Sequence, residues 1–181
     1  MSDTPLPDGL VRVLISEEQI QKRVDELAEQ INKDYAHLDS TLILVGVLKG
    51  SFIFLSDLVR RLTVDHVVDF IALSSYQGGE SGNVRLLMDT RENMEGKHVL
   101  IVEDILDSGN TLDYLMRNFR TRSPKSVRTA VLLDKPDRHI LPIDIAYLGF
   151  TIEDVWVVGY GLDYNEQHRT LPYIAEMVPQ A

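Results

Sequence analysis

Short apolar runs, rich in β-branched residues, alternate with segments of helical periodicity along this chain, and this alternation is the feature that most restricts its fold. The run TLILVGVL is almost entirely apolar, which is typical of a strand buried on both faces of a sheet. Strands are predicted at 10–15, 41–48, 64–74, 84–88, 98–102, 127–133, 146–152 and 155–159, and helices at 17–37, 51–62 and 111–122. Because strands that alternate with helices form βαβ units, we expect an α/β fold with a mostly parallel twisted sheet flanked by helices.

Length and composition limit the classes of protein to which the chain can belong. Its 181 residues fit a single domain, 1–181, with a flexible start at 1–9. The chain contains no cysteine, which excludes disulfides, a thiolate nucleophile and Cys-ligated zinc. The five histidines form no H-E-x-x-H motif and no i, i+4 pair, so a zinc site is not expected.

Charge and hydropathy bear on the partners and the location of the protein. No apolar run approaches the roughly 20 residues that a membrane span needs, and the N-terminus lacks the pattern of a signal peptide. We therefore expect a cytoplasmic protein with no membrane partner. The net charge of −10 disfavours a nucleic-acid partner, which needs a basic surface, but it is compatible with an anionic small molecule bound by local groups.

The stretch 99–111, VLIVEDILDSGNT, carries the most specific motif of the chain. An apolar strand is followed by Glu103 and Asp104, then by Asp107, and then by small polar residues at the start of a predicted helix. Ligands of open α/β sheets bind at the carboxyl ends of the strands, and a helix N-terminus adds about half a positive charge. A phosphate group is therefore predicted to bind at Ser108, Gly109, Asn110 and Thr111. Carboxylates beside it are useful if the ligand also carries sugar hydroxyl groups or Mg²⁺.

An ordinary structural role is the alternative for this stretch. Asp107 or Ser108 would then merely cap the helix at 111–122, and Glu103 and Asp104 would end an ordinary strand. Two acidic residues after four consecutive apolar ones, followed by D-S-G-N-T at the start of a helix, favour the binding site.

Five blocks of the sequence resemble, in their order, those of the type I phosphoribosyltransferases, and specifically the members that act on hypoxanthine and guanine. The blocks lie at 48–51, 75–76, 103–111, 133–135 and 157–169. The resemblance, which extends over residues 10–178, implies a small hood built from the chain ends beside the sheet. It also implies an Mg²⁺-dependent enzyme of purine salvage that converts hypoxanthine or guanine plus 5-phosphoribosyl 1-pyrophosphate (PRPP) to IMP or GMP plus pyrophosphate. A homo-oligomer, dimer or tetramer, is expected from the same resemblance.

The resemblance assigns roles within the central motif. Asp107 would take the proton from N7 of the purine and would thus be the catalytic residue. Glu103 and Asp104 would bind the ribose hydroxyl groups and, together with Asp163, the metal ion. The 107–111 loop would hold the 5′-phosphate of PRPP.

Two separate segments are implied to hold the pyrophosphate. Lys49 and Gly50 lie between a predicted strand and a helix, where backbone N–H groups can face an anion, and the family often has a cis peptide before this lysine. Arg169 is the third implied contact. From the residues alone, Lys49 fits a solvated side chain in a plain turn equally well, and Arg169 fits a surface ion pair with Asp163.

The purine is implied to bind beside Lys135, Trp156, Val157 and Asp163. Lys135 follows a strand, and its ammonium can donate to the 6-oxo group of a base. Trp156 would stack on the ring, and the backbone of Val157 would meet the edge of the base. Without the resemblance, Lys135 is more typical of a surface lysine and Trp156 of a core residue.

The glycine-rich segment that begins at Ser75 and Tyr76 is implied to be a lid over PRPP. We expect 75–89 to be poorly ordered without ligand and ordered with PRPP, because its glycines contribute little packing. An exposed hairpin tip has the same sequence signature and is the alternative.

Two other functions are compatible with parts of the sequence. A PRPP-sensing, RNA-binding regulator on the same fold would need a basic face, which the net charge of −10 disfavours, and would not use a purine pocket. A receiver-type signalling domain would have its acidic pair early in the chain, whereas the acidic cluster here lies in the middle.

Overall fold

A six-stranded sheet forms the centre of the protein in a computed structural model that describes residues 6–37, 39–75 and 84–178. The strand order is β4-β3-β2-β5-β6-β7, and neighbouring strands are parallel except for the antiparallel pair β3 and β4. The strands are β2 (Leu42–Leu48), β3 (His66–Ser75), β4 (Val84–Met88), β5 (His98–Leu106), β6 (Ser126–Asp134) and β7 (Tyr147–Thr151). The predicted α/β fold with a mostly parallel sheet is confirmed.

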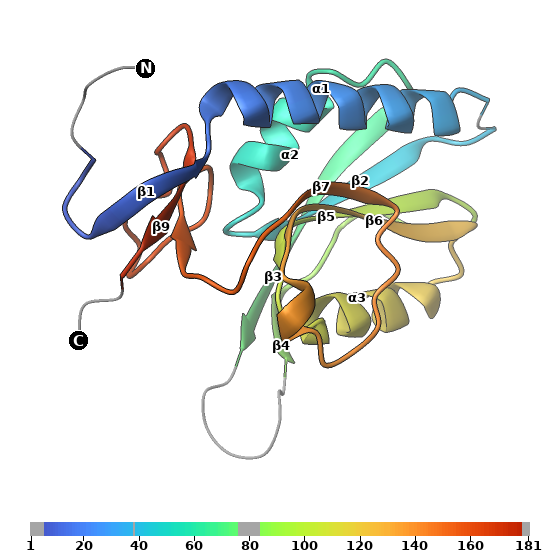
Figure 1. Cartoon of the computed structure of the whole chain (residues 1–181). Coiled ribbons are helices and arrows are strands. Elements are labelled where there is room, and N and C mark those ends of the chain that lie inside the picture. Colours follow the sequence, from blue (N-terminus) through green and yellow to red (C-terminus); the bar gives the residue numbers. More distant parts are fainter. Residues whose placement is uncertain (1–5, 38, 76–83, 179–181) are drawn as a thin grey trace.

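Helices cover both faces of this sheet (Figure 1). On one face lie α1 (Glu17–Asp34) and α2 (Phe52–Val59), and on the other lies α3 (Asn110–Arg120). Helix α1 begins with a capping box, because the Ser16 hydroxyl accepts from the backbone of Gln19 and the Gln19 side chain accepts from the backbone of Ser16. Its apolar stripe packs on the sheet through Ile20, Val24, Leu27, Ala28 and Ile31. A short 3₁₀ turn, η1 (Pro136–Arg138), follows β6.

A small antiparallel sheet, which we call the hood, is built from the two ends of the chain. It contains β1 (Leu10–Ile15), β9 (Ile174–Met177) and β8 (Val157–Val158), in the order β1-β9-β8. Figure 1 shows it beyond one end of the main sheet. The predicted hood is therefore confirmed, although β9 was not predicted and β8 is shorter than the strand expected at 155–159.

The main difference from the sequence-based strands concerns β5. We expected this strand to end at 102, but its pairing with β6 continues through Glu103 and Ile105 to Leu106. The apolar run ends earlier than the strand because the pairing of β5 with β6 continues beyond the last of the consecutive apolar residues. The prediction that Glu103 and Asp104 follow the strand is thus wrong, since both lie within it.

The remaining elements agree closely with expectation. The strands at 10–15 and 84–88 have the predicted bounds, whereas the helix expected at 17–37 ends at Asp34. Among the described residues, no helix is both long enough and apolar enough to cross a membrane.

Candidate active site

The loop between β5 and α3 has the geometry of a phosphate site. Gly109 precedes the helix with a left-handed φ of 89° and, as a glycine, has no side chain with which to cap it. The Ser108 hydroxyl accepts from the backbone N–H of Asn110 at 3.4 Å, while the Asp107 carboxylate accepts from Nε of Arg138 at 2.9 Å. Asp107 therefore does not cap α3, whereas the Ser108 hydroxyl makes one long contact to the first residue of the helix. The first-turn N–H groups of α3 follow directly on the loop that is predicted to hold a phosphate.

Glu103 and Asp104 form an acidic pair at the carboxyl end of β5. Burial raises the pKa of Glu103 well above its ordinary range, and the neighbouring charge of Asp104 raises it further. Burial also raises the pKa of Asp104. Oε2 of Glu103 is buried and has no hydrogen-bond partner among the described residues. Such an oxygen is suited to accept from a ligand hydroxyl or to bind a cation.

Gly50 is the point at which three predicted segments meet. A Cβ atom at this position would lie 1.6 Å from Oδ2 of Asp104, so the carboxylate packs directly against the loop after β2. A Cβ atom on Gly161 would lie 2.0 Å from the carbonyl oxygen of Gly50. The peptide before Lys49 is cis, which the sequence alone left open. The loop is therefore more than a plain strand–helix turn, because its backbone joins the acidic pair to the 159–169 segment.

The 159–169 segment is anchored to α2 and carries Arg169, the predicted pyrophosphate contact. The Tyr160 hydroxyl donates to Oδ2 of Asp57 in α2 at 2.6 Å. Arg169 donates to the carbonyl oxygen of Gly161 at 2.8 Å and pairs with Oδ1 of Asp163 at 2.8 Å. The ion pair between Arg169 and Asp163, which was the alternative to a pyrophosphate contact, is therefore present. It is not an exposed surface pair, because the Arg169 side chain is only 17% exposed.

The contact between Gly161 and Gly50 gives a first testable prediction. Gly161 has a φ of +107°, whereas Gly96 has a φ of +68° and open space where a side chain would begin. We expect Gly96→Ala to lower the free energy of unfolding by about 1–2 kcal/mol, the cost of left-handed backbone. In Gly161→Ala the new methyl group would also clash with the Gly50 carbonyl, and this clash should lower the free energy of unfolding by about a further 1–3 kcal/mol. Urea unfolding of both variants measures this difference, and equal losses would show that the two loops do not press on each other.

Two of the predicted purine residues, Lys135 and Trp156, differ sharply in their exposure. Lys135 is only 9% exposed, and its Nζ lies 3.7 Å from Oδ1 of Asp154, so the alternative of a surface lysine is wrong. Trp156 is 60% exposed and meets Tyr164 edge-on, with 6.3 Å between ring centroids. The alternative of a core tryptophan is therefore also wrong, and the ring has a face available for stacking.

The backbone polar groups of Val157 point away from the rest of the hood. β8 is an edge strand, and the Trp156 carbonyl accepts from Met177 N–H at 3.0 Å. Residues alternate in an antiparallel strand, so the next residue, Val157, directs its N–H and C=O away from β9. Its side chain is buried. Ser75 ends β3, and Tyr76 and the rest of 76–83 lie outside the described residues.

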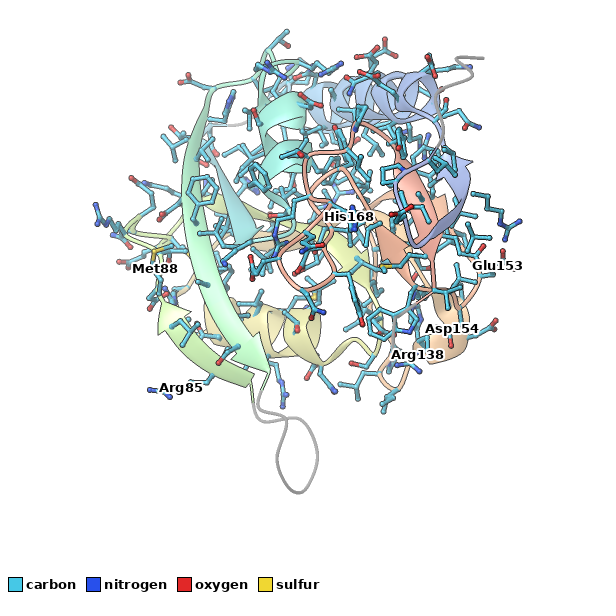
Figure 2. All side chains as sticks on the ribbon, turned by 90° about the vertical axis from the view of Figure 1, so that its left-hand side faces the viewer. Arg85, Met88, Arg138, Glu153, Asp154 and His168 are labelled. Carbon is cyan, nitrogen blue, oxygen red and sulfur yellow. The ribbon has the colours of Figure 1, made fainter. Side chains whose placement is uncertain are left out.

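Two charged residues of the site were missed by sequence reasoning. Glu166 bridges Lys49 and Arg169, with Oε2 at 3.0 and 3.4 Å from their nitrogens. Its spacing of three residues from both Asp163 and Arg169 was the available signal. Arg138 joins Asp107 to Asp154, at 2.9 and 3.9 Å, and no sequence pattern indicated this. Arg138 and Asp154 lie side by side in Figure 2.

Comparisons with known proteins agree with this geometry. Residues 15–165 match the phosphoribosyl transferase domain family. The chain is 46% identical over 170 residues to the hypoxanthine phosphoribosyltransferase of Escherichia coli strain K12, covering 93% of this chain and 96% of that protein.

Solved structures are similar over almost the whole chain. A hypoxanthine-guanine phosphoribosyltransferase from Bacillus anthracis is 45% identical with a TM-score of 0.88, covering 93% of this chain and 99% of that one. A variant of the hypoxanthine phosphoribosyltransferase from Trypanosoma cruzi, in complex with the product IMP, is 41% identical with a TM-score of 0.90, covering 97% and 94%.

Proposed function

The chain belongs to the phosphoribosyltransferase family, and from this premise we propose how its site carries out the reaction of a hypoxanthine-guanine phosphoribosyltransferase. The enzyme acts in purine salvage and converts hypoxanthine or guanine plus PRPP to IMP or GMP plus pyrophosphate. The observation that carries the assignment of the site is the meeting of the Lys49-Gly50 loop, the acidic pair and the arginine segment around Gly50.

PRPP binding accounts for the residues at the carboxyl ends of β2 and β5. The 5′-phosphate would occupy the 108–111 loop at the start of α3, where backbone N–H groups and the helix N-terminus favour an anion. Glu103 and Asp104 would accept from the ribose hydroxyl groups. The pyrophosphate would lie between the Lys49-Gly50 loop and Arg169.

The chemical step transfers the ribosyl group from oxygen to nitrogen. N9 of the purine attacks C1′ as the bond from C1′ to the pyrophosphate oxygen breaks, and the ribose acquires oxocarbenium character. Asp107 would accept the proton from N7, while pyrophosphate leaves with the electron pair of the broken bond. The contacts to the 5′-phosphate and the ribose persist through the reaction and keep C1′ in line with the attacking N9 atom and the departing pyrophosphate oxygen.

Mg²⁺ is part of this proposal. Glu103 has a buried carboxylate oxygen without a described partner beside Asp104, and carboxylate oxygens are ligands that Mg²⁺ prefers. Within the described residues, no three His, Cys, Asp or Glu side chains form a group able to hold a metal, so bound PRPP would supply the remaining oxygens. When bound, the ion would neutralise charge that develops on the departing pyrophosphate.

Asp163 is proposed to act in this metal and pyrophosphate handling. We expect Asp163→Ala to lower kcat/KM for PRPP by about 10-fold and to shift the Mg²⁺ concentration that gives half-maximal rate upward. The rate is measured against Mg²⁺ at fixed PRPP. A raised KM for PRPP with an unchanged Mg²⁺ dependence would limit Asp163 to holding Arg169, with which it pairs.

The purine would lie between Trp156 and the β5–α3 loop. Lys135 would donate to the 6-oxo group, and the outward N–H and C=O of Val157 would pair with the edge of the base. Asp163 would complete this side of the pocket. A lysine donor favours hypoxanthine and guanine over adenine because adenine presents an amino group at the same position.

A PRPP-dependent spectrophotometric assay with five bases tests the proposed function. Hypoxanthine, guanine, xanthine, adenine and uracil are supplied in parallel. Turnover of hypoxanthine or guanine, with little of adenine and uracil, is the expected result. Turnover of uracil or adenine alone would overturn the assignment of the pocket.

Three features of the wider protein belong to the same proposal. The chain 1–181 would act as one domain in the cytoplasm.

The segment 75–89 would close over PRPP as a lid. Protection of the 84–89 amides from hydrogen exchange should therefore rise when PRPP binds. A homo-oligomer, dimer or tetramer, should appear in analytical ultracentrifugation.

A further inference from the structure

Glu166 occupies the place between two cations that are proposed to bind pyrophosphate. Its Oε2 atom lies 3.0 Å from Nζ of Lys49 and 3.4 Å from Nη2 of Arg169. One oxygen therefore contacts both cations, at separations longer than the roughly 2.7–2.9 Å of close charge-assisted hydrogen bonds. The two cations come from segments far apart in the chain, so Glu166 links the two walls of the pyrophosphate site.

The backbone around Glu166 is constrained to place the carboxylate there. Tyr164 and Gln167 exchange backbone hydrogen bonds of 3.2 and 3.0 Å, and the two residues between them have left-handed φ values of 51° and 63°. Left-handed backbone is unfavourable for a glutamate. The Glu166 N–H donates to Oδ2 of Asp163 at 2.8 Å, which holds this turn.

Arg169 is also held by two groups other than the Glu166 carboxylate. Its Nη1 donates to the Gly161 carbonyl and its Nη2 pairs with Asp163. Removing the Glu166 charge therefore leaves the arginine anchored. Lys49 and Glu166 are both about two-thirds exposed, and an exposed pair of this kind is weak enough for a multiply charged anion to displace.

We propose that Glu166 is an internal competitor of pyrophosphate, which binds Lys49 and Arg169 when the site lacks the anion and thereby weakens pyrophosphate binding. This inference rests on the proposed function. Its consequence for the reaction is that pyrophosphate leaves faster, because the Glu166 carboxylate pairs with Lys49 and Arg169 as pyrophosphate departs. Glu166 is thus a residue that sets pyrophosphate affinity and not a catalytic residue.

Calorimetric titration with pyrophosphate in the presence of Mg²⁺ tests this inference. Glu166→Gln keeps the shape of the side chain and removes the charge. We expect it to lower the Kd for pyrophosphate by about 3–10-fold, and the constant for product inhibition by pyrophosphate should fall equally. KM for hypoxanthine should change less than twofold, since Glu166 contacts neither Lys135 nor Trp156 in the residues described. Glu29→Gln, on the exposed face of α1, is the control for the change in net charge.

The outcomes separate this inference from the proposed function. A wild-type protein that binds pyrophosphate with the same Kd as Glu166→Gln would overturn the competitor role and leave the pyrophosphate site intact. Weaker binding by Glu166→Gln would also overturn it, because Glu166 would then orient the cations for the ligand. No pyrophosphate binding by the wild type would overturn the site itself and the inference with it. Thermal unfolding of each variant confirms that the fold is retained.

Discussion

Replacement of Asp107 by asparagine is expected to lower kcat by about 10²–10⁴-fold, the range that general acid–base catalysis usually contributes. Affinity for PRPP should change little. Asparagine keeps an oxygen that can accept from Nε of Arg138, which now lies 2.9 Å from Oδ1 of Asp107, so the side chain can remain in place. What it loses is the ability to take the N7 proton. Single-turnover rates and PRPP binding are measured on the same preparation.

The control for this variant is Asp113→Asn, in the first turn of α3. Asp113 pairs with Arg117 in the same helix, so its replacement removes a charge near the phosphate loop without touching the proposed proton path. We expect less than a twofold effect on kcat from this change. A wild-type kcat for Asp107→Asn with normal PRPP affinity would remove Asp107 from the chemistry.

Arg138 holds the Asp107 carboxylate in position. Three residues of η1 turn the chain after β6, and this turn brings the guanidinium to the end of β5. Because the arginine also approaches Asp154, which approaches Lys135, the residue proposed to accept a proton and the residue proposed to read the base belong to one charged network. The network is tertiary, so sequence spacing could not predict it.

The local part of the site was predictable because its determinants are adjacent in the chain. The pattern of an apolar strand, carboxylates, D-S-G-N-T and a helix predicts a loop within 99–111, and the structure has a loop between β5 and α3, although Glu103 and Asp104 lie within the strand. The length of β5 was not predictable in this way. It depends on pairing with β6, which continues beyond the point where the apolar run ends.

Contacts between distant segments lay beyond sequence reasoning for the same reason. The approach of Gly161 to the Gly50 carbonyl depends on how the 159–169 segment packs on the loop after β2, and the local sequence of neither glycine indicates this contact. The burial of Lys135 and the exposure of Trp156 reverse what their residue types favour. The resemblance to a family, which carries tertiary information, implied a purine beside both side chains, and that role stays a prediction.

Lys135→Gln should have the second large effect, on the choice between a 6-oxo and a 6-amino purine. The ammonium is donor-only and 9% exposed, so opposite adenine it would face another donor with little water to replace the lost partner. Sites that hydrogen-bond a specific group can reject an analogue that lacks it by about 10⁴–10⁵-fold. Glutamine offers both a donor and an acceptor. It should therefore lower kcat/KM for hypoxanthine much more than it raises kcat/KM for adenine.

The size of this change follows from the loss of one charged hydrogen bond. Such a bond contributes about 1.5–3 kcal/mol, which corresponds to a roughly 10–150-fold fall in kcat/KM for hypoxanthine. Lys125→Gln is the matched control, because Lys125 is an exposed lysine paired with Asp39. The ratio of kcat/KM for hypoxanthine to that for adenine should narrow at least tenfold in Lys135→Gln and stay constant in the control. An unchanged ratio in Lys135→Gln would show that Lys135 does not select the base. The outward-facing N–H and C=O of Val157, which no side-chain substitution removes, would then be the better candidates for that selection.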